Sequence, residues 1–168
     1  MEIVTLESIR EVENQLPLLL ADCVESGASV GFLTPVDMDE ILAYWRDVEN
    51  ELAAKSRKLL VATENDQVLG AVQLSLCHKA NGSHRGEVEK LMVKTSARGR
   101  GVAKKLMSHL EDVSKEMGLS LLVLDTRLGD VASTLYQTIG YIEAGQIPQF
   151  ARSSSGELEA TVYFYKLL

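Results

Sequence analysis

The chain reads Leu-Met-Val-Lys-Thr-Ser-Ala-Arg-Gly-Arg-Gly-Val-Ala from Leu91 to Ala103. Before this segment the residues alternate as in a strand, and after it apolar residues recur on one helical face as far as Met117. The start of a helix exposes unpaired N–H groups and the positive end of the helix dipole. Gly99 and Gly101 let that backbone approach an anion without a Cβ in the way. The segment therefore predicts a turn that binds phosphate.

Two arginines, Arg98 and Arg100, add positive charge to this turn. An Arg-Gly-Arg-Gly string also occurs in solvated surface loops and in RNA-binding tails, but here a predicted strand and an amphipathic helix bracket it. The GxGxxG fingerprint of dinucleotide-binding proteins and the GxxxxGK[ST] string of P-loops are both absent. The turn is thus expected to bind phosphate in a protein that belongs to neither of these two classes.

Strands and helices are interleaved along the rest of the chain. Ser8 and Glu11 form a capping-box pattern that predicts a first helix, and a loop is expected around Pro148 and from Ser153 to Gly156. Strands are predicted near 3–6, 59–62, 68–77, 87–93, 119–124, 141–146 and 157–166, and helices near 8–25, 37–52, 103–117 and 131–138. This order predicts an α/β (α+β) fold in which helices pack on a mixed sheet. No repeat or linker interrupts it, so a single domain over residues 1–168 is expected.

Charge and composition narrow the classes of function. The net charge of -7 and pI near 5.0 disfavour nucleic acid as a partner. The N-terminus does not resemble a signal peptide and the apolar runs are too short to span a membrane, so a cytoplasmic protein without membrane contact is expected. Cys77 is interpreted as a small core residue, not a nucleophile. The histidines have no metal-ligand spacing, so no metal is expected.

The pattern Arg98-x-x-Gly101-x-Ala103 resembles the pyrophosphate motif of the GNAT superfamily of N-acetyltransferases. Further along, Tyr136 followed by Gly140-Tyr141 is similar to a later family motif. The resemblance covers nearly the whole chain and is closest to the tabtoxin-resistance acetyltransferase type, judged from residues 28–32, 73–77, 87–93 and 124–126. One departure is Gly129, where many members carry an asparagine that contacts the CoA arm.

The resemblance implies acetyl-CoA as co-substrate and a mostly antiparallel sheet of about seven strands with about four helices on both faces. It also implies a V-shaped opening between the fourth and fifth strands, where the backbone of Leu91 and Val93 pairs with the pantetheine amides as an added strand. A backbone N–H near Val93 would face the acyl carbonyl. The cofactor-binding residues would be Leu91, Met92, Val93, Arg98, Gly99, Arg100, Gly101, Val102, Ala103 and Lys104.

Three residues are candidates for catalysis. An alkylamine is mostly protonated at neutral pH, so a base is needed, and Glu87 is the first choice with Asp125 assisting. Glu89 lies two residues away and is expected to be solvated. Asp125 is either a cap for the next segment or a substrate ligand. Tyr136 either packs in the core or, as the resemblance implies, protonates the leaving CoA thiolate.

The expected reaction is direct acetyl transfer, within a ternary complex, to the primary amine of a small molecule. The subgroup resemblance implies an amino-acid-like toxin or antibiotic as acceptor, and hence a role in antibiotic resistance. The alternative is a non-catalytic domain that senses acyl-CoA or scaffolds a partner. Arg98 and Arg100 could instead form a nucleic-acid patch, which the acidic balance disfavours. A homodimer that pairs through an exposed C-terminal strand is also expected.

Overall fold

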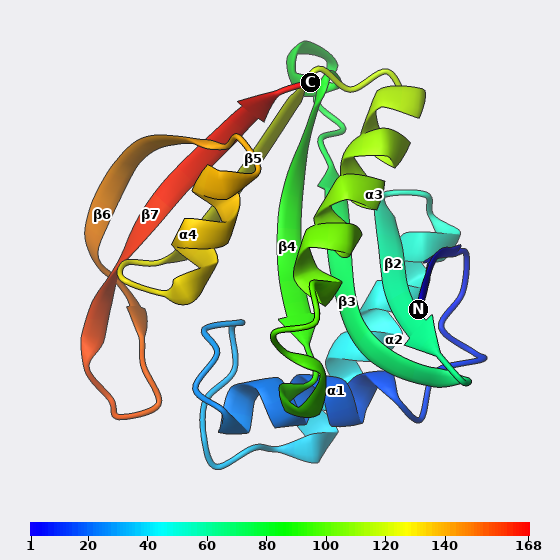
Figure 1. Ribbon diagram of the computed structural model, residues 1–168, viewed down its shortest axis with the longest axis vertical. Helices are drawn as coiled ribbons and strands as arrows, with labels where there is room; N and C mark the ends of the chain where they lie inside the picture. Colours follow the sequence, from blue (N-terminus) through cyan, green and yellow to red (C-terminus); the bar gives the residue numbers. More distant parts are fainter.

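A single seven-stranded sheet runs through the computed structural model, which describes residues 1–168 (Figure 1). The strand order is β1-β2-β3-β4-β5-β7-β6, and only β4 and β5 run parallel. The strands are β1 (Glu2–Leu6), β2 (Arg57–Glu64), β3 (Gln67–Leu76), β4 (Arg85–Val93), β5 (Leu121–Arg127), β6 (Ile142–Arg152) and β7 (Leu158–Leu167). The helices are α1 (Leu16–Glu25), α2 (Met38–Ala53), α3 (Val102–Glu116) and α4 (Val131–Thr138), with short 3-10 turns η1 (Ala80–Gly82) and η2 (Thr95–Ala97). The predicted fold class is confirmed.

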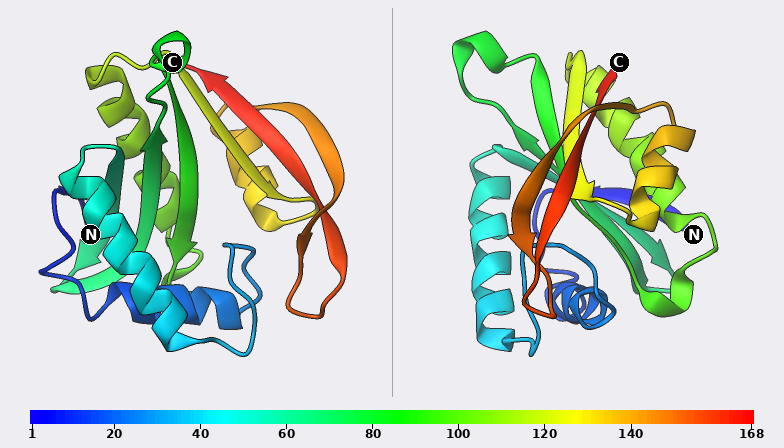
Figure 2. Two further views of the ribbon diagram at one scale, coloured as in Figure 1. Left: turned by 180° about the vertical axis from the view of Figure 1, so that it is seen from behind. Right: turned by 90° about the vertical axis from the view of Figure 1, so that its left-hand side faces the viewer.

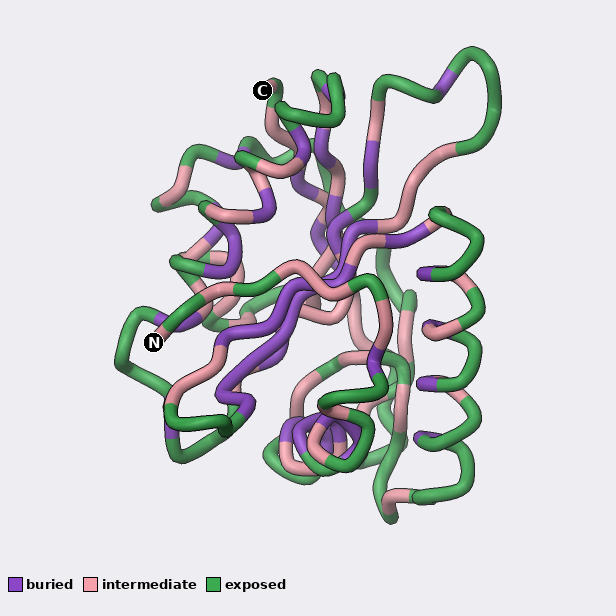
Figure 3. The backbone as a smooth tube through the Cα atoms, turned by 90° about the vertical axis from the view of Figure 1, so that its right-hand side faces the viewer, coloured by how far each residue is buried: buried purple, intermediate pink, exposed green.

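The helices cover both faces of the sheet (Figure 2). Helices α1 and α2 bury a cluster that includes Leu16 and Trp45 against one face, and α3 and α4 bury a second that includes Leu106 and Tyr136 against the other. In α2 the buried positions follow one side of the helix, facing the sheet (Figure 3). Each fully buried leucine contributes roughly 1.5–3 kcal/mol, so both layers stabilise the sheet. None of the helices combines the length and apolarity that a membrane crossing requires.

The first helix begins later than the sequence suggested. The expected start at Ser8 is wrong, because α1 begins at Leu16 with Pro17 in its first turn. The Ser8 hydroxyl instead donates to Glu49 Oε1 at 2.8 Å, and the Ile9 N–H donates to Glu49 Oε2 at 2.8 Å. Ser8 therefore does not cap a helix but contributes to a tertiary contact with α2. The second helix does begin at its expected cap, because Asp37 accepts from the N–H groups of the first turn.

The C-terminal hairpin also differs from expectation. Pro148 lies inside β6 and not in a loop, which is possible because β6 is an edge strand with a register irregularity between Ile147 and Ala151. The C-terminal strand β7 is paired on both sides, by β5 and β6. The exposed edge expected for β7 is thus wrong, and β6 provides that edge.

The parallel pair of strands separates along its length. Strands β4 and β5 are paired only from Arg85 to Glu87 and from Leu121 to Val123, and beyond these residues no pairing joins them. Their divergence is visible in Figure 1, where β5 and β7 tilt away from β4. A β-bulge in β4, where Lys90 has a φ of 52°, bends the strand next to this gap. One edge of β4 is therefore left without a partner strand.

Candidate active site

A cavity of about 770 Å³ occupies the gap between β4 and β5. Its walls come from both strands, the turn that leads into α3, the inner side of α4, the loop after α1, and the β6–β7 hairpin. Its volume is within the range of about 300–1,000 Å³ typical of small-molecule and cofactor sites. The fold thus places the predicted opening, the predicted anion-binding turn and α4 around one space.

The turn before α3 has the backbone features expected of an anion-binding turn. Gly99 and Gly101 have φ angles of 75° and 77°, and a Cβ on either would meet no atom within 4 Å. The Lys105 N–H donates to the Gly101 carbonyl at 3.1 Å, so the N–H groups of the three preceding helix residues have no earlier carbonyl of the helix to bond. These N–H groups and the open space beside the glycines fit the diphosphate of acetyl-CoA.

The two arginines of this turn point in different directions. Arg98 lines the cavity, and its guanidinium donates to Ser26 Oγ at 2.6 Å and to the Val93 carbonyl at 3.3 Å. Arg100 binds both carboxylate oxygens of Glu64, at 2.9 and 2.7 Å, and does not line the cavity. Of the predicted cofactor-binding side chains, Arg100 therefore lies outside the cavity.

The outer part of β4 supplies backbone to the cavity. Leu91 and Val93 line it, whereas the side chain of Met92 is 2% exposed and packs among α1 and α2. Because pairing with β5 has ended at Glu87, this edge of β4 has no partner strand. An extended chain of amides fits beside such an edge as an added strand. The remaining predicted residues, Gly99, Gly101, Val102, Ala103 and Lys104, also line the cavity.

Three carboxylates lie where the strands separate. Glu87 is the last residue of β4 paired with β5; it is exposed and is not part of the cavity lining, whereas Asp125 and Glu89 line the cavity. Desolvation, and then the charges of Glu89 and Asp125, raise the pKa of Glu87. Asp125 lies inside β5 and accepts from Thr161 Oγ1 at 2.7 Å, while the cap of α4 is Asp130. The alternative role of Asp125 as a cap is therefore wrong. No three of the His, Cys, Asp and Glu side chains gather as a metal site would require.

Glu89 does not simply face solvent as expected: its side chain is 29% exposed, and its carboxylate belongs to a polar network around the buried Arg57. Arg57, 9% exposed, donates to Glu89 Oε2 at 2.7 Å and to Gln73 Oε1 at 2.8 Å, and it also pairs with Glu51. The Tyr44 hydroxyl donates to the same Gln73 oxygen at 2.9 Å. The network connects α2 to β2, β3 and β4. Of the two carboxylates of β4, Glu89 is paired with Arg57 and Glu87 has no arginine partner.

Removal of Arg57 should destabilise the fold more than removal of its neighbour. Arg57→Met leaves two carboxylates without their buried counter-ion and should lower the free energy of unfolding by about 3 kcal/mol. Lys58→Met breaks the Lys58–Glu7 pair, whose Glu7 side chain is 72% exposed, and should cost less than about 1 kcal/mol. Urea unfolding of both variants measures this difference. Equal losses would show that the network contributes no more than a surface pair.

Tyr136 lines the cavity from α4 and is 5% exposed. Its ring packs against Tyr141 at 5.8 Å and Phe164 at 5.9 Å between centroids. Burial, and then the charges of Asp130 and Asp125, raise the pKa of Tyr136, so the hydroxyl keeps its proton at neutral pH. Core packing and a role at the leaving thiolate, the two predicted roles of Tyr136, are compatible, because its ring packs in the core and the residue also lines the cavity.

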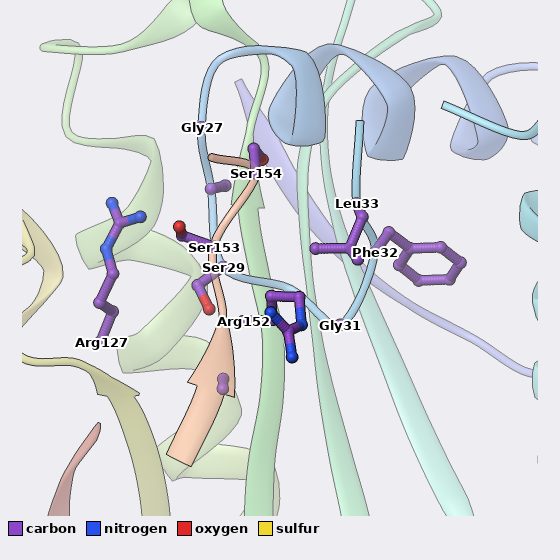
Figure 4. A pocket seen from close by; sticks show the side chains of 11 residues that line it. Gly27, Ser29, Gly31, Phe32, Leu33, Arg127, Arg152, Ser153 and Ser154 are labelled. Carbon is purple, nitrogen blue, oxygen red and sulfur yellow. The ribbon is translucent and has the colours of Figure 1, made fainter. Parts of the chain in front are cut away.

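A second cavity of about 230 Å³ adjoins the first between the loop after α1 and the β6–β7 loop. Figure 4 shows Arg127 and Arg152 with Ser29, Ser153 and Ser154 around it. The two cavities share Gly27, Ala28, Ser29, Gly31, Arg127 and Ala151. No sequence pattern pointed to these arginines or to Lys90, which also lines the large cavity, because only the fold brings them together.

Comparison with known proteins agrees with this geometry. Residues 24–152 match the model of the Acetyltransferase (GNAT) family. An L-methionine sulfoximine/L-methionine sulfone acetyltransferase from Pseudomonas aeruginosa is 30% identical over 152 residues, covering 87% of this chain and 86% of that protein. The crystal structure of a ribosomal-protein-alanine N-acetyltransferase from Brucella melitensis is similar with a TM-score of 0.80 and 25% identity, covering 100% of both chains.

A further similar structure is that of the acetyltransferase yncA from Salmonella typhimurium with its cofactor acetyl-CoA, with a TM-score of 0.78 and 20% identity, covering 100% of this chain and 95% of that one. The family match covers most of the chain and agrees with the cradle before α3 and with the separation of β4 from β5. The predicted family is thereby confirmed. The chain belongs to the Acetyltransferase (GNAT) family, and it is an N-acetyltransferase whose acyl donor is acetyl-CoA.

Proposed function

We propose that the chain, acting as one acetyltransferase domain, transfers the acetyl group directly to the primary amine of a small, amino-acid-like molecule. The observation that carries this proposal is the arrangement of the large cavity, with an anion-binding turn at one part of its wall and carboxylates where β4 and β5 part. The relative that acetylates L-methionine sulfoximine and L-methionine sulfone, which are amino-acid analogues, supports the acceptor class. It also supports the tabtoxin-resistance type and a role in resistance.

On the donor side, the N–H groups of Val102, Ala103 and Lys104 hold the diphosphate, with Arg98 adding charge at the rim. The free edge of β4 at Leu91 and Val93 aligns the extended arm. Acetyl-CoA, when bound, supplies the acetyl group as a thioester. Alignment of two bound reactants then provides most of the rate enhancement in a direct transfer.

On the acceptor side, Glu87 accepts the proton that the ammonium group must lose before it can attack. Desolvation and the charges of Glu89 and Asp125 raise its pKa, which makes it a stronger base than an ordinary carboxylate. Asp125 assists by holding the ammonium, and Thr161 Oγ1 fixes the position of its carboxylate. Glu89 contributes negative charge to Glu87 but is bound by Arg57.

Tyr136 acts at the leaving sulfur. Because the pKa of Tyr136 lies above its ordinary value of about 10, and a thiol has a pKa near 8.5, the hydroxyl stabilises the sulfur chiefly by donating a hydrogen bond. A hydrogen bond to a charged group contributes about 1.5–3 kcal/mol.

Tyr136→Phe should therefore lower kcat about 10- to 100-fold and leave the Kd for acetyl-CoA within about twofold. Tyr141→Phe removes a neighbouring hydroxyl that does not line the cavity, and it should leave kcat close to that of the wild type. Steady-state kinetics and calorimetry on both variants provide the test. Similar losses in the two variants would assign Tyr136 to packing alone.

The proposed acceptor class is tested by a screen of amines with acetyl-CoA and a readout of free thiol. L-methionine sulfone and L-methionine sulfoximine should release thiol faster than spermidine or a lysine peptide. Turnover of spermidine or peptides alone would reject the amino-acid-like acceptor. Binding of acetyl-CoA without turnover of any amine would instead support a sensor or scaffold. Analytical ultracentrifugation tests the proposed homodimer, for which β6 offers a free edge.

A further inference from the structure

Lys90 is a cation that the proposed chemistry does not use. It is partly buried in the wall of the large cavity, and its Nζ lies 5.5 Å from the centre of the Tyr44 ring. A Cβ added to Gly31 would lie 3.3 Å from the same Nζ, so the ammonium abuts the loop after α1. Gly31 lines both the large and the small cavity, and the ammonium therefore stands near their boundary.

The bulge in β4 gives Lys90 this direction. In a regular strand, neighbouring side chains point to opposite faces of the sheet. Here both Glu89 and Lys90 reach toward the α2 side, where Glu89 meets Arg57 and Lys90 meets Tyr44. Lys90 has a φ of 52°, an uncommon conformation for a residue other than glycine, asparagine or aspartate. The strand therefore adopts a locally unfavourable backbone that turns a lysine toward the cavity.

No protein carboxylate neutralises this ammonium. The charged groups that face Lys90 are Glu89, Arg57 and Asp125, and no carboxylate oxygen lies within ion-pair distance of its Nζ. Glu89 is occupied by Arg57, and Asp125 by Thr161. Burial accordingly lowers the pKa of Lys90. A desolvated cation without a counter-ion is unfavourable, so an anionic ligand would gain affinity there.

Charge around the acceptor space is divided between two parts of its wall. Glu87 and Asp125 lie where the strands part, and they suit the ammonium of an acceptor. Lys90 stands at the boundary with the small cavity, whose wall contains Arg127 and Arg152 but no carboxylate. Arg127 is already paired with Glu159 and Asp130, whereas Lys90 has no carboxylate partner. This division matches a molecule that carries both an amine and a carboxylate.

We infer that Lys90 Nζ binds the carboxylate of the acceptor and so selects amino acids and their analogues over simple amines. This inference rests on the proposed acetyl transfer, because it places the anion beside the carboxylates that would receive the amine. An ammonium paired with a carboxylate in a partly desolvated site forms a charge-assisted hydrogen bond, and its loss reduces binding by roughly 10- to 100-fold.

The test compares L-methionine sulfone with its carboxamide, which differs only by lacking the negative charge. Both are titrated by calorimetry into protein saturated with coenzyme A, where no turnover occurs. The acid should bind the wild type at least 10-fold more tightly than the carboxamide. Lys90→Met should reduce this preference at least 10-fold, and Lys90→Arg should retain part of it. Arg152→Met, a change at a residue that lines only the small cavity, should change it less than twofold.

Several results would overturn the assignment. The first is that the acid does not bind the wild type. The second is that Lys90→Met keeps the preference for the acid over the carboxamide, and the third is that only Arg152→Met loses it. A gain of one acetyl group on Lys90 after incubation with acetyl-CoA, detected by peptide mass spectrometry, would also overturn it by making the lysine an acceptor. If Lys90-dependent binding is found but acetyl-CoA gives no turnover, the carboxylate site stands and the proposed function fails.

Discussion

Gly101→Val should weaken the binding of acetyl-CoA about 100-fold, measured by calorimetry. Gly101 has a φ of 77° at the N-terminus of α3, and a side chain there would occupy the space that faces the N–H groups of the first turn. A branched residue also disfavours this left-handed conformation by about 1–2 kcal/mol, which would displace the turn. The loss of one or two hydrogen bonds to the charged diphosphate accounts for the rest.

Gly118 offers a matched control at the other end of the same helix. It has a φ of 79°, and a Cβ on it would also meet no atom within 4 Å, but it does not line the cavity. Gly118→Val therefore introduces similar backbone strain without touching the donor site. Its Kd for acetyl-CoA should stay within about twofold of the wild type. Equal weakening in both variants would mean that strain in α3, and not a blocked cradle, lowers the affinity.

Glu87→Gln should lower kcat/KM for the amine about 100-fold, a typical effect of losing a general base. The Kd for acetyl-CoA should change little, because Glu87 is not among the residues that line the cavity. In the wild type only the ionised carboxylate is active, so the rate should fall as the pH drops through its pKa. Since desolvation and neighbouring charges raise that pKa, the fall should begin above the ordinary value of about 4.3.

The pH profile separates loss of a base from general damage. Glu87→Gln has no group to titrate, so its residual rate should lack this acidic limb. Glu116→Gln alters an exposed carboxylate at the C-terminal end of α3 and should behave as the wild type. Glu89→Gln should lower stability through Arg57 more than it lowers turnover. A Glu87→Gln enzyme with normal turnover and an unchanged profile would remove Glu87 from the mechanism.

Much of the donor side followed from local patterns. Gly99, Gly101 and Arg98 lie within one turn of chain, so their spacing was enough to predict the turn, and the apolar periodicity predicted α3. The start of α2 at Asp37 was likewise predictable, because this side chain accepts hydrogen bonds from N–H groups of the helix's own first turn. The same reasoning failed at Ser8, because its hydroxyl bonds Glu49, 41 residues away, and no local pattern reveals such a partner.

The acceptor side depended on contacts between distant segments. The sequence pattern predicted that Glu89 lies on a solvated strand face, but in the fold its carboxylate is bound by Arg57, which also pairs with Glu51. The direction of Lys90 depends on a bulge, and strand alternation alone cannot show where an extra residue is inserted. Arg100 was expected to bind phosphate because it lies in the turn, but in the fold it forms an ion pair with Glu64 at the end of β2.

The cavity between β4 and β5 also brings together coenzyme binding and acceptor recognition, which depend on different parts of the sequence. In the proposed site one short stretch, residues 91–104, holds the coenzyme, whereas the acceptor side draws on Lys90 and Asp125 and on the segments 27–33 and 150–161, far apart along the chain. Point changes in those remote loops would alter which amine is recognised and leave the coenzyme machinery intact. A split sheet of this kind thus allows one donor to serve many acceptors as sequences drift.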